Sequence, residues 1–359
     1  MTKPITAVLL SCSGLELTDD EKRLFAAANP VGVALFGRNI KTAAQIRKLT
    51  TEIKETIGRD DVLIAVDQEG GRVRRLAGTE FHQVAHNITL GQLPPAQAAE
   101  ASRLQALLIS DDLLRCGINL NLAPVLDRLQ DDTSPVLKSR CFSSDEKVIS
   151  RLGNIMIDEY LNNHICPCVK HLPGHGRANV DPHLQLPVIT ASLDELAADF
   201  YPFQQASSAP SGLTAHIILE QVDSQFPVTQ SAKAIQEVIR GLLNFDGFLF
   251  SDALEMHALK GSLSEKATLA LNAGCDCVVY ALGNIDDLKT LAAVCPPLTD
   301  QAQERLHRIS RLIADAPAGL DTQSAAAQYQ ALIGQIEPYE DTYDATEILN
   351  ILQQTRRNQ

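Results

Sequence analysis

Short apolar runs and segments with helical spacing alternate along most of the chain. Eight apolar runs predict strands at Ile5–Leu10, Val31–Phe36, Val62–Val66, Ile118–Leu126, Ile165–Val169, Leu213–Leu219, Gly247–Phe250 and Cys275–Leu282. Segments between them predict helices at Thr42–Ile57, Pro95–Cys116, Asp145–Asn162, Ser192–Ser207, Ala232–Asn244 and Ser264–Ala273. Alternating strands and helices build a parallel sheet, because each parallel pairing needs a crossover. Eight such units predict an α/β fold, a (β/α)8 TIM barrel formed by residues 1–297.

The pattern changes after Pro296. Leu298–Ile313 predicts a helix, and the Ala-, Gln- and Asp-rich remainder predicts helices near Ala325–Ile333 and Ala345–Gln354. This is too little sequence for a second α/β domain. We therefore expect a single domain, with residues 298–359 as a short helical C-terminal extension packed on the barrel or trailing from it.

Polar residues follow the C-terminal ends of several predicted strands. They are Asp67, Gln68, Glu69, Asp127, Lys170, His171, His216, Ser251 and Asp252. In a barrel these strand ends open on one rim, where active sites are built. An open doubly wound sheet is the alternative fold. It would usually carry a glycine-rich phosphate loop after the first strand, and Ser11–Gly14 lacks that fingerprint.

Charge and hydropathy narrow the range of partners. The formal net charge of −13 argues against binding to nucleic acid or to an anionic membrane, since both need clustered Lys and Arg. No apolar run approaches the roughly 18 residues of a membrane span. Ile5–Leu10 is also shorter than the roughly 7–15 apolar residues of a signal peptide, and Lys3 alone precedes it as a basic residue. We read this run as the first strand and expect a cytoplasmic monomer.

The eight cysteines fit that compartment. Cys166 with Cys168 and Cys275 with Cys277 form pairs two residues apart within apolar runs, so each pair faces one side of a strand. Such a pair can ligate a metal, but thiols in strand-forming runs are more often small buried hydrophobes. We favour the structural interpretation.

The most informative polar cluster is Lys170–Gly176, followed by Asp181–His183. It combines an ammonium, three imidazoles and a carboxylate on a glycine-containing loop after a buried strand, which favours a functional site over a solvated turn. Pro182 favours an extended backbone at Asp181, so the side chains at 181 and 183 can lie on the same side. An Asp beside a His can orient the imidazole and stabilise its protonated form, as general acid/base catalysis requires.

Two further segments carry candidate chemistry. Asp252 directly follows a buried strand and is suited to act as a nucleophile, base or metal ligand, although such a residue can also cap a helix. Asp67–Arg75 contains two carboxylates, three arginines and Gly70-Gly71, a suitable set for binding hydroxyl or carboxylate oxygens. A zinc site built from His171, His175 and His183 is a weaker alternative, because Pro173 and Gly174 break the helix that such spacing needs.

Five segments together resemble glycoside hydrolase family 3, and they occur in the family's order. They are Ala65–Val73, Lys170–Gly176, Thr214–His216, Phe250–Leu254 and Ala273–Asp276. The resemblance runs from about Ala7 to Leu282. Within the family, the chain is most similar to the bacterial β-N-acetylglucosaminidases of cell-wall recycling.

This resemblance implies a role for each matching residue. Asp252 corresponds to the nucleophile of a retaining glycosidase, and His183, supported by Asp181, to an acid/base that replaces the usual second carboxylate. The positions that would bind the hydroxyls of N-acetylglucosamine are Asp67, Arg75, Arg140, Lys170 and His171. The resemblance implies neither a metal nor an organic cofactor.

The chain departs from the family pattern at several positions. Pro182 stands where Ser is usual, Leu172 where Phe is common, and Ser139–Phe142 where Glu-Arg-Ser-Phe is usual. We expect Pro182 to stiffen the loop that carries His183. The assignment of Arg140 is correspondingly weaker than that of Asp252.

The implied substrate is a small molecule, N-acetylglucosaminyl-1,6-anhydro-N-acetylmuramic acid with or without its peptide. Many family β-glucosidases take their acid/base from a second domain, for which the chain has no room, so an internal His183 favours the N-acetylglucosaminidase branch. A β-glucosidase or β-xylosidase, a β-N-acetylglucosaminide phosphorylase, a metal-dependent barrel hydrolase and a non-catalytic sugar-binding barrel are the alternatives.

Overall fold

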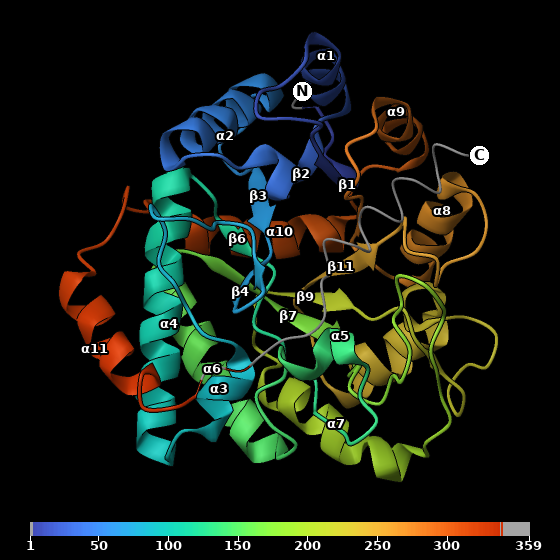
Figure 1. The fold of residues 1–359 in the computed structure, drawn as a ribbon. Coiled ribbons are helices and arrows are strands. Elements are labelled where there is room, and N and C mark those ends of the chain that lie inside the picture. The colour runs from blue at the N-terminus through green and yellow to red at the C-terminus, as the bar shows by residue number, and fades with distance from the viewer. Residues whose placement is uncertain (1–2, 338, 340–359) are drawn as a thin grey trace.

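A computed structural model describes residues 3–337 and 339, and the helix expected near Ala345–Gln354 lies outside them. The predicted (β/α)8 barrel is confirmed: eight parallel strands close in the order β1-β12-β11-β9-β7-β6-β3-β2 (Figure 1). The strands are β1 (Thr6–Ser11), β2 (Pro30–Leu35), β3 (Leu63–Val66), β6 (Leu120–Asn121), β7 (Cys166–Leu172), β9 (Ser211–Thr214), β11 (Phe248–Ala253) and β12 (Cys277–Val279).

The strand expected over Ile118–Leu126 is much shorter in the structure, at β6. Side-chain amides replace part of its backbone ladder. The Asn119 amide accepts from Ile64 N (2.7 Å) and donates to Val62 O (3.0 Å), while the Asn121 amide accepts from Gln68 N (3.1 Å) and donates to Gln68 O (3.0 Å). These contacts satisfy buried backbone groups without a regular strand.

Helices surround the barrel on all sides (Figure 1). Those that follow the eight strands are α1 (Asp19–Ala28), α2 (Ala43–Ile57), α4 (Pro95–Cys116), α6 (Glu146–Asn162), α7 (Leu193–Gln205), the π-helix Ala234–Leu242, α8 (Leu263–Ala273) and α9 (Ile285–Val294). The sequence pattern missed α1 and α9. Both have a polar N-cap that could have signalled them: Thr18 forms a capping box with Glu21, and Asn284 accepts from two backbone N–H groups of α9.

Helix α10 (Asp300–Ile313) crosses the N-terminal end of the barrel (Figure 1). Its Leu306 and Ile309 pack in one buried cluster with strand residues of the barrel interior, such as Leu9 and Phe248. Hydrophobic side chains therefore fill this end of the barrel, and the opposite end is left for a site.

An ion-pair network fastens α10 to the barrel. Arg305 is buried and contacts Asp276 (2.9 Å) and Asp246 (2.6 Å), and Asp276 also pairs with Arg240 (3.1 Å). Buried charges need such partners, because an ion removed from water without one is strongly destabilising.

Replacing Arg305 with Ala should lower the free energy of unfolding by about 3 kcal/mol, because the buried Asp276 loses one of its two cations. Urea unfolding would measure the change. Arg308→Ala is the matched control: Arg308 also pairs with Asp246, but both side chains are exposed, so the loss should stay below about 1 kcal/mol. Equal losses in the two variants would contradict the importance of the buried network.

Helix α11 (Gln323–Ile333) packs against α4. Tyr329 of α11 is buried, donates a hydrogen bond to Gln105 and accepts one from Ala85 N (2.8 Å). Within the described part of the chain, no helix combines the length and the apolar character that crossing a membrane requires.

Candidate active site

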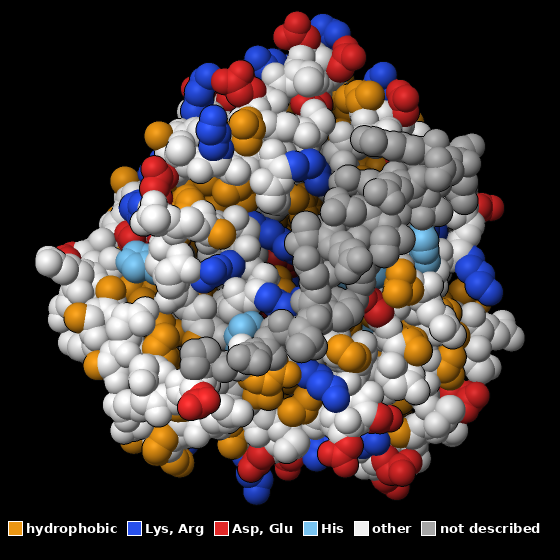
Figure 2. Space-filling model, in the orientation of Figure 1, with side chains coloured by type: hydrophobic (Ala, Val, Ile, Leu, Met, Phe, Trp, Pro, Cys, Tyr) orange, Lys and Arg blue, Asp and Glu red, His pale blue; other side chains and the backbone are white. Residues whose placement is uncertain are grey.

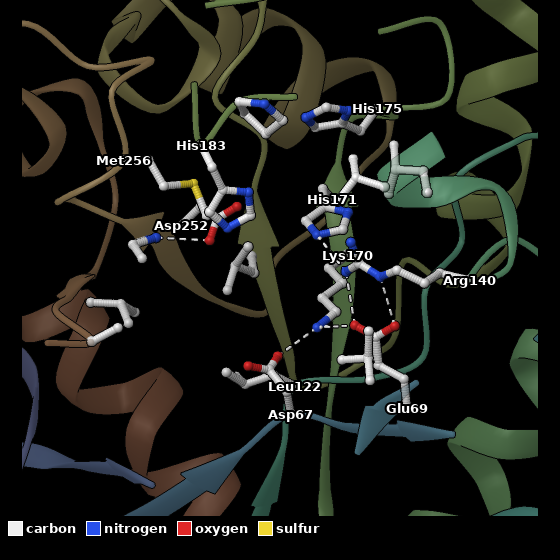
Figure 3. A pocket seen from close by; sticks show the side chains of 18 of the residues that line it. Asp67, Glu69, Leu122, Arg140, Lys170, His171, His175, His183, Asp252 and Met256 are labelled. Atoms are coloured by element: carbon white, nitrogen blue, oxygen red, sulfur yellow. Dashed lines mark hydrogen bonds and ion pairs between the residues drawn. The ribbon is translucent and has the colours of Figure 1, made fainter. Parts of the chain in front are cut away.

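The C-terminal end of the barrel holds a pocket into which strand ends and their loops project charged side chains (Figure 3). Seven of the residues predicted from the sequence line it, namely Asp67, Arg75, Arg140, Lys170, His171, His183 and Asp252. Asp181, the eighth, is buried and hydrogen-bonded to His183. The structure therefore brings together side chains from widely separated segments of the chain.

Positive side chains gather over this end of the molecule. Figure 2, drawn in the orientation of Figure 1, shows Lys and Arg side chains near the middle of the visible face. The cations that line the pocket are Arg72, Arg75, Arg140 and Lys170. The site thus concentrates positive charge locally in a protein whose formal net charge is −13.

Two carboxylates after β3 hold these cations in place. Lys170 Nζ lies 2.7 Å from Asp67 Oδ1 and 2.7 Å from Glu69 Oε1. Arg140 binds both oxygens of Glu69, with Nε–Oε2 and Nη2–Oε1 distances of 2.8 Å. Arg75 lies farther from Asp67, at 3.6 Å. Glu69 is therefore the shared counter-ion of Lys170 and Arg140.

A glycine pair turns the chain between these groups. Glu69 lies on β4 (Gln68–Gly70), which pairs with β5 (Val73–Arg74) as a small antiparallel hairpin. Gly70 and Gly71 have φ angles of 116° and 56°, in the region that only glycine adopts readily. The chain turns sharply at Gly70-Gly71, and the turn directs Glu69 and Arg75 toward one pocket.

Electrostatics keep the cluster ionised. Burial alone would raise the pKa of Asp67, but the nearby Lys170 and Arg75 outweigh it and lower that pKa. Burial opposes ionisation of Glu69 in the same way, and Arg140 and Lys170 hold its pKa well below the usual range. Both carboxylates are charged at neutral pH, so Lys170 and Arg140 keep fixed positions.

His171 is held in one tautomer. Its Nδ1–H donates to Asp127 Oδ2 (2.6 Å), since a carboxylate can only accept, and its Nε2 accepts from Arg140 Nη2 (3.3 Å). Burial opposes ionisation of Asp127, but the adjacent His171 lowers the pKa of this carboxyl overall. Asp127 thereby orients His171 and, through it, Arg140.

Asp252 lies at the end of β11 on the opposite side of the pocket from Arg140 (Figure 3). Its Oδ1 accepts a hydrogen bond from Ala253 N (2.7 Å), and its side chain is partly exposed to the pocket. His216 supports this strand end, because its Nε2–H donates to Ala253 O (3.0 Å). Burial lowers the pKa of His216, so it supports β11 as a neutral ring.

Asp181 and His183 form a rigid pair. Asp181 Oδ1 accepts from both the backbone N (2.9 Å) and Nδ1 (2.7 Å) of His183, which leaves Nε2 available to the pocket. The segment after Asp252 holds the loop that carries His183 through two backbone hydrogen bonds. His257 N donates to His183 O (3.3 Å), and Ala258 N donates to Pro182 O (3.1 Å). The described conformation therefore presents His183 and Asp252 to the same cavity.

Sequence reasoning assigned no role to Glu69 and Glu255, which line the pocket, or to Asp127, which is buried and orients His171. It considered His175, which also lines the pocket, only as a metal ligand. Glu69 and Asp127 were recognised at strand ends, but their contacts with Lys170, Arg140 and His171 join segments that are distant in the sequence. Among the described residues, His82, Asp111 and Asp112 form a group with metal-ligand spacing, and His171, His175 and His183 do not. The zinc alternative at those three histidines is therefore not supported by their arrangement.

Comparison with known proteins decides the family. Residues 7–312 match the Glycosyl hydrolase family 3 N terminal domain. The chain belongs to glycosyl hydrolase family 3. The resemblance seen in the sequence motifs is thus confirmed, and the chain is an enzyme that hydrolyses glycosides.

Relatives and solved structures agree with this assignment. A β-hexosaminidase of Bordetella avium is 33% identical over 338 residues, which cover 91% of this chain and 94% of the relative. A β-hexosaminidase of Alkalilimnicola ehrlichii is 35% identical over 310 residues, which cover 84% of this chain and 88% of the relative. NagZ from Neisseria gonorrhoeae superposes with a TM-score of 0.80 at 30% identity, covering 92% of this chain and 98% of that one.

Proposed function

We propose that the chain is a retaining exo-β-N-acetylglucosaminidase. It releases terminal N-acetylglucosamine from 1,6-anhydromuropeptides during cytoplasmic peptidoglycan recycling. The arrangement that carries this proposal is the pocket shared by Asp252, the Asp181–His183 pair and the ion-paired cluster around Glu69. The β-hexosaminidase names of the relatives support the substrate class, and eight buried free cysteines are consistent with a reducing compartment.

The proposed reaction has two steps. The Asp252 carboxylate attacks the anomeric carbon while protonated His183 gives its Nε2 proton to the departing glycosidic oxygen, so the sugar becomes bonded to Asp252. Neutral His183 then removes a proton from water as the water oxygen attacks the anomeric carbon, and Asp252 is released. Asp181 holds the Nδ1–H of His183 in both steps. No cofactor takes part.

The cluster around Glu69 binds the sugar hydroxyls in this proposal. Asp67 offers acceptor oxygens, and Lys170, Arg140 and Arg75 offer charge-assisted donors. The Arg75 Nε has no hydrogen-bond partner among the described residues, so it is a spare donor. Both ring nitrogens of His171 already have partners, which makes its main effect the orientation of Arg140.

Rates on the 4-nitrophenyl β-glycosides of N-acetylglucosamine and glucose test the proposed specificity. We expect kcat/KM to be at least ~100-fold higher for the N-acetylglucosaminide, because hydrogen bonds to a substituent give large discrimination. Release of free N-acetylglucosamine in phosphate buffer, rather than its 1-phosphate, would support hydrolysis. Faster cleavage of the glucoside, or accumulation of the sugar phosphate, would overturn the assignment.

Replacing Glu69 with Gln should lower kcat/KM by about 100-fold, because Lys170 and Arg140 lose their common counter-ion and shift within the pocket. Steady-state kinetics on the nitrophenyl N-acetylglucosaminide would measure the loss. Glu159→Gln is the control: this residue of α6 contacts Arg103 at 3.7 Å, outside the pocket, and its loss should leave kcat/KM unchanged. A normal kcat/KM in Glu69→Gln would exclude the positioning role.

A further inference from the structure

The pocket contains a buried imidazole, His175, to which the proposed reaction assigns no role. His175 follows β7, is 2% exposed and lines the cavity. Its backbone N–H donates to Asp127 Oδ1 (2.7 Å), and its ring lies edge-on to the ring of His171, with centroids 5.5 Å apart. Among the described residues, neither ring nitrogen of His175 has a hydrogen-bond partner. Buried imidazoles rarely lack a partner without a functional reason.

The ring of His175 is neutral at working pH. Burial lowers the pKa of His175 to about 4. A neutral imidazole has one N–H donor and one acceptor nitrogen. The His175 ring, at the edge of the pocket, therefore holds one uncharged donor and one uncharged acceptor, and neither has a partner within the described part of the chain.

We propose that His175 contacts the 2-acetamido group of the sugar and helps to select N-acetylated substrates. This inference rests on the proposed function and adds to it the residue that recognises the substituent at C2. The contact is a single hydrogen bond, given by the ring N–H to the acetamido carbonyl or accepted by the ring nitrogen from the acetamido N–H.

The position of His175 favours C2 over the other sugar carbons. Figure 3 shows His175 at the end of the pocket away from Asp67, beyond His183 and His171. A pyranose whose anomeric carbon faces Asp252 and whose 3-hydroxyl faces Arg140 carries its C2 substituent between those two contacts. His175 borders the space between them, since its ring packs on His171 and it lines the same cavity as Asp252.

The chemistry of the group agrees with this position. An acetamide is uncharged and has one N–H and one carbonyl, which match the donor and acceptor of a neutral imidazole. A buried group that must be paired rejects ligands that leave it unpaired, so a contact of this kind discriminates strongly between substrates. The pocket cations near the sugar hydroxyls are already paired with Asp67 and Glu69, whereas the His175 ring has no partner in the segments that the structure describes and can serve a different substituent.

The test compares His175→Leu and His175→Gln with the wild type on the nitrophenyl N-acetylglucosaminide and glucoside. His175→Leu should lower kcat/KM for the N-acetylglucosaminide by ~10- to 100-fold, at least ten times more than for the glucoside. The melting temperature should stay the same or rise, because the variant removes a buried unpaired polar group. His175→Gln, which keeps a donor and an acceptor, should recover part of the discrimination.

His164→Asn is a matched control for the loss of an unpaired imidazole. Within the described residues the Nδ1 of His164 is also buried without a partner, but His164 lies outside the pocket, so both substrates should be cleaved as by the wild type. Equal losses on the two substrates in His175→Leu, together with a lower melting temperature, would show a purely structural role and overturn the proposal.

An NMR titration separates this proposal from the proposed function. The ¹⁵N signals of the His175 ring, assigned by their loss in His175→Gln, should shift when N-acetylglucosamine binds and should shift much less with glucose. If the wild type prefers the glucoside, the proposed function fails, yet a shift specific to N-acetylglucosamine would still support the contact. The absence of any such shift while N-acetylglucosamine binds would overturn it.

Discussion

Asp252→Asn is expected to lower kcat by at least ~10³-fold, equivalent to about 4 kcal/mol of transition-state stabilisation. Asn has nearly the same shape and can still accept the hydrogen bond from Ala253 N, so the pocket should keep its geometry. The amide, however, is a poor nucleophile and cannot form the covalent glycosyl ester that a retaining mechanism requires. Steady-state rates on the nitrophenyl N-acetylglucosaminide, with a melting curve for each protein, measure this loss.

A covalent trap identifies the nucleophile directly. A 5-fluoro sugar should form a stable ester with the wild-type enzyme, and mass spectrometry of its peptides should locate the label on Asp252. Glu255 is the internal control, because it lines the same pocket three residues later but is engaged by Ala281 N (3.2 Å). A label on Glu255, or an inverted product anomer by NMR, would contradict the assignment of Asp252.

His183→Ala is expected to separate substrates according to their leaving groups. A natural sugar leaving group needs a proton as it departs, so its cleavage should slow by ~10²- to 10⁴-fold without the imidazole. Nitrophenolate departs without that proton, so the first step should be nearly unchanged on the nitrophenyl sugar. A pre-steady-state burst of nitrophenol measures this first step separately from the attack of water, which also depends on His183.

Two comparisons make the experiment decisive. Asp181→Asn keeps a group beside Nδ1 but removes the carboxylate, so its leaving-group dependence should have the same direction as that of His183→Ala and a smaller size. Equal losses on both substrates in His183→Ala would mean that His183 only positions the sugar and that another group supplies the proton.

Much of the fold follows from local patterns in the sequence. The alternation of apolar runs and amphipathic segments predicted the barrel, because parallel strands need crossovers and eight units close. Local patterns failed where the decisive contacts are distant in sequence. The β6 strand is short because Asn119 and Asn121 bond to the segment around β3 with their side chains. Helices α1 and α9 are marked more clearly by their N-caps than by their periodicity.

The candidate site was predictable to a similar degree. Strand ends identified Asp67, Lys170 and Asp252, because all C-terminal ends of a parallel barrel share one rim. The contacts of Glu69 with two cations distant in the sequence could not be predicted, since they depend on how the segments after β3 and β6 and the strand β7 meet at the rim of the barrel. His175 was considered only as a metal ligand, and its lack of partners is visible only in three dimensions.

The packing of α10 across the N-terminal end of the barrel has a kinetic consequence. Because Leu306 and Ile309 help to fill that end, the pocket has to load and empty through its opposite mouth. In the proposed reaction, the aglycone departs first and water follows it inward, while the cleaved sugar, held deepest, leaves last. Free N-acetylglucosamine should therefore act as a competitive product inhibitor, and the aglycone should compete with water for the glycosylated enzyme.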